Sequence, residues 1–212
     1  MGRPRVVELV RAPAVSETPP VLSPSLLVAA YRSGYFPMAM EGGEIGWFSP
    51  DPRGILPLAA FHAPRRLQRV LRSARFSVTV DTAFRGVMEA CAADRDEGTW
   101  ISAEIVDAYC ALHAAGAAHA VEVWRDERLV GGLYGVSLGA VFFESMFHRE
   151  RDASKVALAF LVARLKDRGY ELLDIQWTTP FLETFGAVEI PKELYLLRLE
   201  RALRRSCRFD DR

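Results

Sequence analysis

The sequence predicts an α/β protein built around one mixed β-sheet, and the order of its elements is the main reason. Three segments with strand-like alternation, at 120–124, 128–137 and 140–147, precede a helical pattern over 152–168 and a further strand at 170–176. Strands joined by short turns pair antiparallel, whereas a strand that follows a helix packs parallel to an earlier strand. With 212 residues, 50% of them hydrophobic, the chain is long enough to bury the core of such a sheet.

This β-β-β-α-β order is that of the acetyltransferase-type (GNAT-type) fold. In that fold a cofactor pyrophosphate normally binds a glycine-rich loop at the start of the helix. The corresponding segment here, HRERDAS at 148–154, contains no glycine, so its backbone is poorly suited to a close approach. We therefore expect an acetyltransferase-like domain over residues 61–212 that uses neither coenzyme A nor another cofactor.

The first sixty residues predict a small, irregular N-terminal subdomain, residues 1–60. Residues 1–20 are rich in proline and unpatterned, which indicates a poorly ordered arm. Ser23 and Pro24 then mark the start of a helix that Gly34 ends. The density of Gly, Pro and aromatic residues over 35–57 predicts only short strands, at 45–49 and 54–56.

The segment 61–75 carries five arginines and no acidic residue. Helical spacing predicts that it forms a basic helix whose exposed arginines are Arg65, Arg66, Arg69 and Arg72. Such a face is commonly only solvated, but without acidic partners four residues away a contact with nucleic-acid phosphates is a competing explanation. A strand at 76–80 and helices at 84–91 and 102–116 follow, and a polar loop at 94–100 separates the two helices.

The C-terminal part predicts two more helices. Gly169 ends the helix that begins at Asp152, and a short helix over 180–185 stops at Gly186. The tail over 193–208 has the spacing of an amphipathic helix with arginines along one side: Arg198, Arg201, Arg205 and Arg208.

Composition excludes several classes of protein. The 27 cationic and 27 acidic side chains give a net charge of zero, which argues against general adhesion to nucleic acid. No apolar run is long enough to span a membrane and the N-terminus lacks a signal-peptide pattern, so we expect a cytoplasmic protein. The three cysteines and four histidines lack the spacing of a disulfide framework or a metal site, so we expect no metal.

One acidic side chain lies within an aromatic strand. Strand alternation places Glu144 on the same face as Phe142 and Met146. A carboxylate among aromatic side chains is costly unless a cation or a hydrogen-bond donor meets it. Glu144 therefore either faces water or pairs with an internal arginine, or else it supplies one fixed negative charge to an aromatic-walled pocket.

Several short segments resemble those of one known family. They are WFSPDPR at 47–53, DRDEGTW at 94–100, ESMF at 144–147, ASK at 153–155, and LLDIQ and FGAVEIP within 172–191. In this order, over roughly residues 25–197, they resemble the leucyl/phenylalanyl-tRNA–protein transferases. The resemblance implies an N-end-rule enzyme that moves leucine or phenylalanine from aminoacyl-tRNA to the α-amino group of a protein beginning with Arg or Lys. The preference among leucine, phenylalanine and methionine is left open.

The resemblance also implies roles for individual residues. Asp174 matches the family's essential acid, Gln176 its partner amide, and Glu144 a carboxylate on the acceptor side. The pocket for the aminoacyl side chain would be lined by Leu133, Phe143, Met146 and Leu158. Trp100 and Tyr109 match positions near the terminal adenosine, and the four exposed arginines at 65, 66, 69 and 72 become candidates for tRNA binding. Departures from the family pattern are a missing GGDL segment, Met38 for Trp, Phe181 for His, and one residue fewer before Glu144.

The implied chemistry needs little assistance. An ester donor and an amine acceptor react downhill without ATP, and an α-amino group with a pKa near 8 is already partly unprotonated at neutral pH. One carboxylate and one amide at a strand end can orient the amine and assist its proton transfer, and residues i and i+2 of a strand share a face. Without the resemblance, Asp174 would more simply be an acid at a sheet end that caps the next helix.

Two other functions remain open from the sequence. One is an acyltransferase of related fold that uses another aminoacyl or acyl donor, such as a peptidoglycan-type enzyme or one that binds coenzyme A. The other is a non-catalytic tRNA-binding module, which would explain the arginines but gives Asp174, Gln176 and Glu144 no task. We expect the protein to act as a monomer.

Overall fold

The computed structural model describes residues 6–10, 22–93 and 99–210, and within these ranges the strands form two sheets. The larger sheet has the strand order β10-β4-β9-β8-β7-β6-β5, and the smaller has the order β1-β3-β2. The strands of the smaller sheet are β1 (Val6–Val10), β2 (Phe36–Ala39) and β3 (Ile45–Asp51). Those of the larger sheet are β4 (Arg53–Ile55), β5 (Ser77–Val80), β6 (Ala118–Arg125), β7 (Arg128–Leu138), β8 (Val141–His148), β9 (Leu172–Gln176) and β10 (Val188–Ile190).

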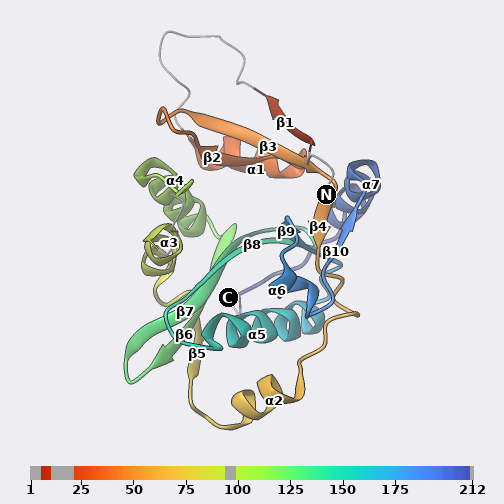
Figure 1. Cartoon of the computed structure of the whole chain (residues 1–212). Helices are drawn as coiled ribbons and strands as arrows, with labels where there is room; N and C mark the ends of the chain where they lie inside the picture. The colour runs from red at the N-terminus through yellow and green to blue at the C-terminus, as the bar shows by residue number, and fades with distance from the viewer. Residues whose placement is uncertain (1–5, 11–21, 94–98, 211–212) are drawn as a thin grey trace.

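Helices cover both faces of the larger sheet (Figure 1). On one face, toward the smaller sheet, lie α1 (Pro24–Arg32), α3 (Phe84–Ala93), α4 (Ala103–Ala114) and α7 (Lys192–Leu203). On the other face lie α5 (Ala153–Asp167) and, beyond it, α2 (Arg65–Arg72). The short α6 (Pro180–Glu183) follows β9. The core accordingly divides into two clusters, one on the α1 side of the sheet and one on the α5 side.

The predicted mixed sheet is confirmed by the strand pairing. β6, β7 and β8 pair antiparallel in sequence, and β9, which follows α5, pairs parallel to β8. This is the predicted β-β-β-α-β order of the acetyltransferase-like fold. The start of α5 differs in detail, because Asp152 has a left-handed backbone (φ 73°) and its side chain makes no capping bond. Its carboxylate instead accepts a 2.7 Å hydrogen bond from Lys155.

The N-terminal region is more regular than the sequence predicts. The expected unpatterned arm is wrong for Val6–Val10, which pair with β3, while the rest of residues 1–20 lies outside the described residues. The predicted helix start is confirmed, since the Ser23 hydroxyl accepts a hydrogen bond from Leu26 N. β4 precedes the predicted boundary near residue 60 but lies in the larger sheet, and the division into two domains stays a prediction.

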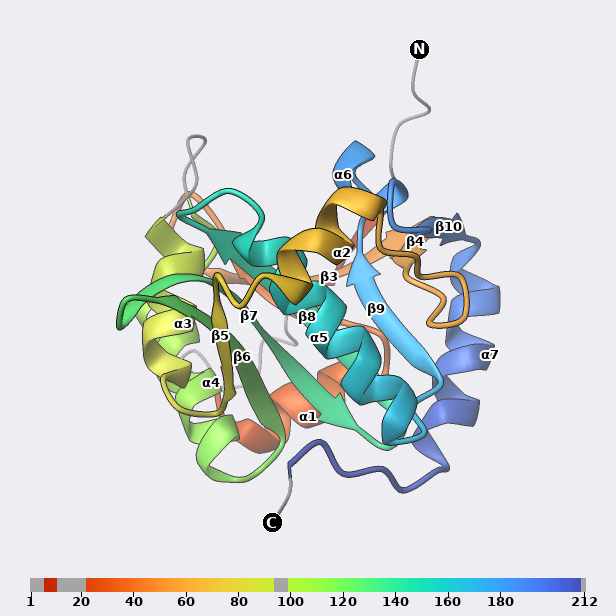
Figure 2. The same ribbon diagram turned by 90° about the horizontal axis from the view of Figure 1, so that it is seen from below.

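After α7 the chain runs back toward the middle of the molecule (Figure 2). Phe209 is buried there, with its ring centroid 4.9 Å from that of Phe142. Arg164 of α5 donates a 2.8 Å hydrogen bond to the Phe209 carbonyl, and Arg168 donates one of 2.6 Å to that of Asp210. The C-terminal segment is therefore fastened to α5. Within the described ranges, no helix combines the length and apolar character that crossing a bilayer requires.

Candidate active site

The parallel ladder between β8 and β9 ends close to two acidic residues. Its last pair is Phe143 and Asp174, while β8 continues in register with β7 as far as His148. Asp174 shares its face with Phe143, toward α1 and α7, and Glu144 is the next residue of β8 and faces α5. The structure thus places Glu144 and Asp174 on neighbouring strands at the point where the β8–β9 pairing ends, with their side chains on opposite faces of the sheet.

Asp174 is completely buried and accepts four hydrogen bonds. Arg53 donates two of them in a fork, from Nε to Oδ1 at 2.9 Å and from Nη2 to Oδ2 at 2.7 Å. The Tyr195 hydroxyl donates to Oδ2 at 2.6 Å, and the backbone N–H of Gln176 donates to Oδ1 at 2.9 Å. Asp174 therefore accepts all four bonds, which come from three residues.

Arg53 is also completely buried, and further groups contact its guanidinium. Its guanidinium carbon lies 5.1 Å from the ring centroid of Phe36 and 4.5 Å from that of Tyr195, and its Nη1 donates to the Gly34 carbonyl at 3.0 Å. Burial acts to lower the pKa of Arg53, but the charge of Asp174 and the bonds to it raise this pKa above its usual value. The guanidinium therefore remains charged, and the pair is neutral as a whole.

Gln176 ends β9 in a left-handed conformation, with φ 58°. This conformation is uncommon for a residue with a side chain, and it is held by the hydrogen bond from the backbone N–H of Gln176 to the Asp174 carboxylate. The side-chain Nε2 of Gln176 donates to the Asp174 backbone carbonyl at 3.2 Å, so the nitrogen of the side-chain amide already has a partner. The side chain is half-buried, so its carbonyl oxygen Oε1 is the end left to accept a hydrogen bond from a substrate.

Glu144 is buried without a full set of partners. Its side chain is 5% exposed, and its Oε2 has no hydrogen-bond partner among the described residues. Burial, and secondly the charge of Asp174, raise the pKa of Glu144 to about 8. The predicted internal arginine partner is wrong, since the buried Arg53 pairs with Asp174 instead. A buried carboxyl with one unpartnered oxygen is the feature expected of a site that binds a cation.

The raised pKa makes a testable prediction for stability. Between about pH 4.5 and 8 the native protein holds a proton on Glu144 that the unfolded chain has lost, so the free energy of unfolding should fall as the pH rises. The total loss should be about 5 kcal/mol, because the pKa rises by about 3.5 units and each unit corresponds to about 1.4 kcal/mol. Glu144→Gln should lack this slope. Urea unfolding of both proteins at several pH values measures it, and parallel curves would contradict the burial argument.

The predicted pocket residues fall on two faces of the sheet. Leu133 and Leu158 are completely buried in the α5-side cluster, and Met146, which is opposite Leu133 in the ladder, packs against it. Phe143 lies on the other face, with its ring centroid 4.6 Å from that of Tyr31. Strand alternation places Glu144 on the same α5-facing side of the sheet as the first three, whereas Phe143 lies on the opposite side.

The two residues predicted near the adenosine lie in the α1-side cluster. Tyr109 is 1% exposed, and its hydroxyl bonds that of Tyr31. Trp100 is half-buried and packs against the same cluster, and its carbonyl accepts a 2.9 Å bond from Ala39 N. Most of the preceding polar loop, residues 94–98, lies outside the described residues.

The predicted basic helix is α2, and all four of its arginines are exposed. Arg66 lies 3.9 Å from Asp152, at the N-terminus of α5, and Arg72 donates to the Gln68 carbonyl at 3.2 Å. Leu67 is the buried anchor that turns the arginine face outward. The helix thus presents a basic surface on the α5 side of the molecule (Figure 1).

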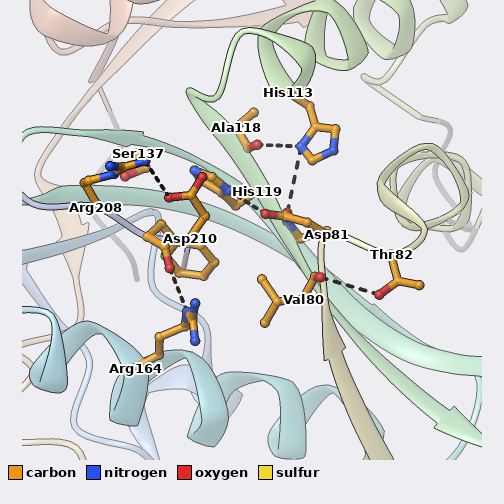
Figure 3. Close-up of polar contacts among 12 residues, drawn as sticks. Val80, Asp81, Thr82, His113, Ala118, His119, Ser137, Arg164, Arg208 and Asp210 are labelled. Carbon is orange, nitrogen blue, oxygen red and sulfur yellow. Dashed lines mark hydrogen bonds and ion pairs between the residues drawn. The ribbon is translucent and has the colours of Figure 1, made fainter. Parts of the chain in front are cut away.

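A polar cluster that the sequence did not predict lies at the far edge of the sheet. Asp81, His113 and His119 offer ligand atoms within 4.8 Å of one another, so they could hold a metal ion (Figure 3). However, His119 Nδ1 lies 2.8 Å from Asp81 Oδ2, and His113 Nδ1 lies 2.7 Å from the Ala118 carbonyl. A carbonyl only accepts, so His113 Nδ1 carries a proton and is not a ligand in this arrangement. The cluster fits a hydrogen-bond network that joins β5, α4 and β6.

Sequence reasoning missed two residues at the site, Arg53 and Tyr195. Arg53 closes the segment WFSPDPR and precedes Gly-Ile-Leu, and a lone cation beside a short apolar strand is a signal for a buried ion pair. Tyr195 lies in the amphipathic tail, where its spacing indicates a core position and nothing indicates its hydrogen bond. Both contacts join segments more than 20 residues apart, which no local pattern reveals.

Comparison with known proteins gives a consistent result. Residues 55–200 match the family model "Leucyl/phenylalanyl-tRNA protein transferase", and residues 21–51 match the model of its N-terminal domain. A relative in Herpetosiphon aurantiacus, named leucyl/phenylalanyl-tRNA–protein transferase, is 53% identical over 190 residues, covering 89% of this chain and 98% of that protein. A relative of the same name in Paramagnetospirillum magneticum is 53% identical over 195 residues, covering 89% and 93%.

Solved structures resemble the chain more distantly. The structure of L-PGS from Bacillus licheniformis superposes with a TM-score of 0.44 at 11% identity, covering 84% of this chain and 70% of that one. A GCN5-related N-acetyltransferase-like protein from Streptococcus suis gives a TM-score of 0.40 at 17% identity, covering 78% and 63%.

Proposed function

The chain belongs to the leucyl/phenylalanyl-tRNA protein transferase family, and we propose that it moves leucine, phenylalanine or methionine from aminoacyl-tRNA to the α-amino group of proteins that begin with Arg or Lys. The observation that supports this acceptor class is the buried, unsatisfied carboxyl of Glu144, on the same face of the sheet as the apolar side chains of Leu133, Met146 and Leu158. The proposed product carries a new N-terminal residue that marks it for degradation.

In the proposed reaction the acceptor nitrogen attacks the ester carbonyl of the aminoacyl-tRNA. A C–N bond forms, the C–O bond to the terminal ribose breaks, and one proton passes from the nitrogen to the ribose oxygen. Gln176 Oε1 accepts a hydrogen bond from the attacking amine and so orients it. Asp174, which already accepts four bonds, acts on the substrates through Gln176. An ester and an amine react in this way without ATP or a metal ion.

Glu144 supplies the specificity for the acceptor. A cationic side chain entering beside Glu144 would meet Oε2, the oxygen without a partner, and would favour the ionised carboxylate. Because Glu144 holds its proton up to about pH 8 in the free protein, binding of a cationic acceptor releases that proton. Aminoacyl-tRNA is made in the cytoplasm, and we place the enzyme there, acting as a monomer.

The basic surface of α2 is proposed to bind the tRNA backbone. The double variant Arg65→Ala, Arg69→Ala should weaken tRNA binding and raise its KM, with little change in kcat. The slope of log affinity against log salt should fall by about two, since each lost phosphate contact removes roughly one released counterion.

Filter binding of tRNA over a range of salt concentrations measures this slope. The matched control is Arg198→Ala, which removes an exposed arginine of α7 on the opposite face of the sheet. An unchanged slope in the double variant would mean that the α2 arginines are merely solvated.

A single assay tests the proposed function against its alternatives. The protein is incubated with Leu-tRNA carrying labelled leucine and with a peptide beginning with Arg, in the absence of ATP and coenzyme A. Label in the peptide supports the proposal. Label that reaches short amino-acyl acceptors equally well would indicate an acyltransferase with another acceptor, and tRNA binding without transfer would indicate a binding module.

A further inference from the structure

The four donors around Asp174 come from three separate parts of the chain. Arg53 supplies two, and it is itself held by the Gly34 carbonyl and by the rings of Phe36 and Tyr195. Tyr195 supplies the third from α7, and the Gln176 amide is the fourth. Burial and the charge of Asp174 raise the pKa of Tyr195 well above its usual value, so its hydroxyl remains a donor.

We propose that Arg53 and Tyr195 are positioning residues for aminoacyl transfer, which fix the Asp174 carboxylate so that it holds Gln176 in its left-handed conformation. This inference rests on the proposed function for the identity of the reaction. It assigns to Arg53 and Tyr195 no contact with either substrate, because both are buried and engaged with Asp174.

The backbone around Gln176 shows why such positioning is required. A left-handed conformation at a residue with a Cβ is unfavourable and persists only when its surroundings impose it. Asp174 Oδ1 imposes it through the Gln176 amide. Gly54, the neighbour of Arg53, allows a close approach, since a Cβ there would lie 2.7 Å from the Trp177 carbonyl carbon. Arg53 and Gly54 thus fix the segment 174–178 from two directions.

The identity of Arg53 matters as much as its charge. Nε and Nη2 contact the two oxygens of Asp174 in parallel, and Nη1 remains for Gly34. Lysine has one compact ammonium group and cannot make this planar pair of bonds while it also reaches Gly34. An Arg53→Lys variant therefore keeps the neutrality of the buried pair and loses its geometry.

Two variants test the proposal. Tyr195→Phe removes one donor and keeps the ring, and it should lower kcat for leucyl transfer by about 10-fold or more, as expected for a lost bond to a charged group, with the KM for Leu-tRNA unchanged. Arg53→Lys should lower kcat further. The matched control is Tyr170→Phe, which removes the hydroxyl of another buried tyrosine, bonded to Ser137 at 2.5 Å and not to Asp174, and should leave kcat unchanged.

Hydrogen exchange gives a second measurement that does not depend on activity. In Tyr195→Phe and in Arg53→Lys the peptide containing residues 174–178 should exchange roughly 10-fold faster than in the wild type, because the Gln176 amide loses a fixed acceptor, whereas Tyr170→Phe should not change it. A kcat within twofold of the wild type together with unchanged exchange in both variants would overturn the proposal. An inactive wild type would overturn the proposed function alone, since the exchange comparison would still decide this inference.

Discussion

Asp174→Asn is expected to lower kcat for transfer from Leu-tRNA to an Arg-initiated peptide by about 10² to 10⁴, the range for lost assistance to proton transfer, which Asp174 provides through Gln176. Asparagine keeps the shape of the side chain but replaces one acceptor oxygen with a donor. In either orientation that donor would face Arg53, together with Tyr195 at the Oδ2 position or the Gln176 backbone N–H at the Oδ1 position, and all three groups donate in the native site. The main chain at Gln176 then loses its anchor, while the affinity for tRNA, which depends on distant groups, should be unchanged.

Stability must be measured together with this rate. The variant leaves the Arg53 charge buried without a counter-charge, which typically costs about 3–5 kcal/mol of stability. The control is a double variant, Asp174→Asn with Arg53→Met, which removes the unpaired charge and should recover stability without recovering activity. Wild-type kcat in either protein would contradict the role of Asp174.

Glu144→Gln should lower kcat/KM for Arg-initiated peptides by roughly 10- to 100-fold, because a hydrogen bond to a charged group contributes about 1.5–3 kcal/mol. Glutamine keeps the volume and can still accept one hydrogen bond, so the loss isolates the charge. Peptides that begin with a neutral residue should gain relative to Arg-initiated ones. The unsatisfied Oε2 is the structural reason, since in the proposed function it is the oxygen that would bind the acceptor's cation.

A competition between peptides measures this discrimination. Arg-initiated and norleucine-initiated peptides are mixed with the same Leu-tRNA, and the ratio of products is compared between the wild type and Glu144→Gln. Leu158→Ala is a useful control, because it changes the neighbouring apolar wall and should alter the use of the aminoacyl group without altering the preference for a cation. Equal discrimination by the wild type and Glu144→Gln would return Glu144 to a purely structural role.

The main sheet could be predicted because its signals are local. Alternation and turns define β6 to β8, and Gly169 ends α5 before β9, so the order follows directly. The strands β1, β2 and β10 could not be predicted in this way. Residues 6–10 and 188–190 are short edge strands whose only support is pairing with β3 or β4, and a single sequence does not show such distant partners.

At the candidate site too, the features with local signals could be predicted and those that depend on distant residues could not. Strand alternation correctly places Glu144 with Phe142 and Met146, since that argument needs only the period of a strand. The sequence predicts that Asp174 and Gln176 share a strand face, but Gln176, the last residue of β9, has a left-handed backbone (φ 58°) and contacts Asp174 through its backbone N–H. The buried fork of Arg53 on Asp174 depends on residues 121 positions apart, and only the fold brings them together.

The proposed transfer is tested most directly by finding where leucine becomes attached to the peptide. Wild-type protein, Leu-tRNA and a peptide beginning with Arg are incubated without ATP, and the product peptide is sequenced from its N-terminus. If the proposed transfer occurs, leucine will be the first residue of the product peptide and Arg the second. The same peptide with an acetylated N-terminus will give no product. Leucine released only as the free acid, or leucine attached equally to peptides that begin with neutral residues, would contradict it.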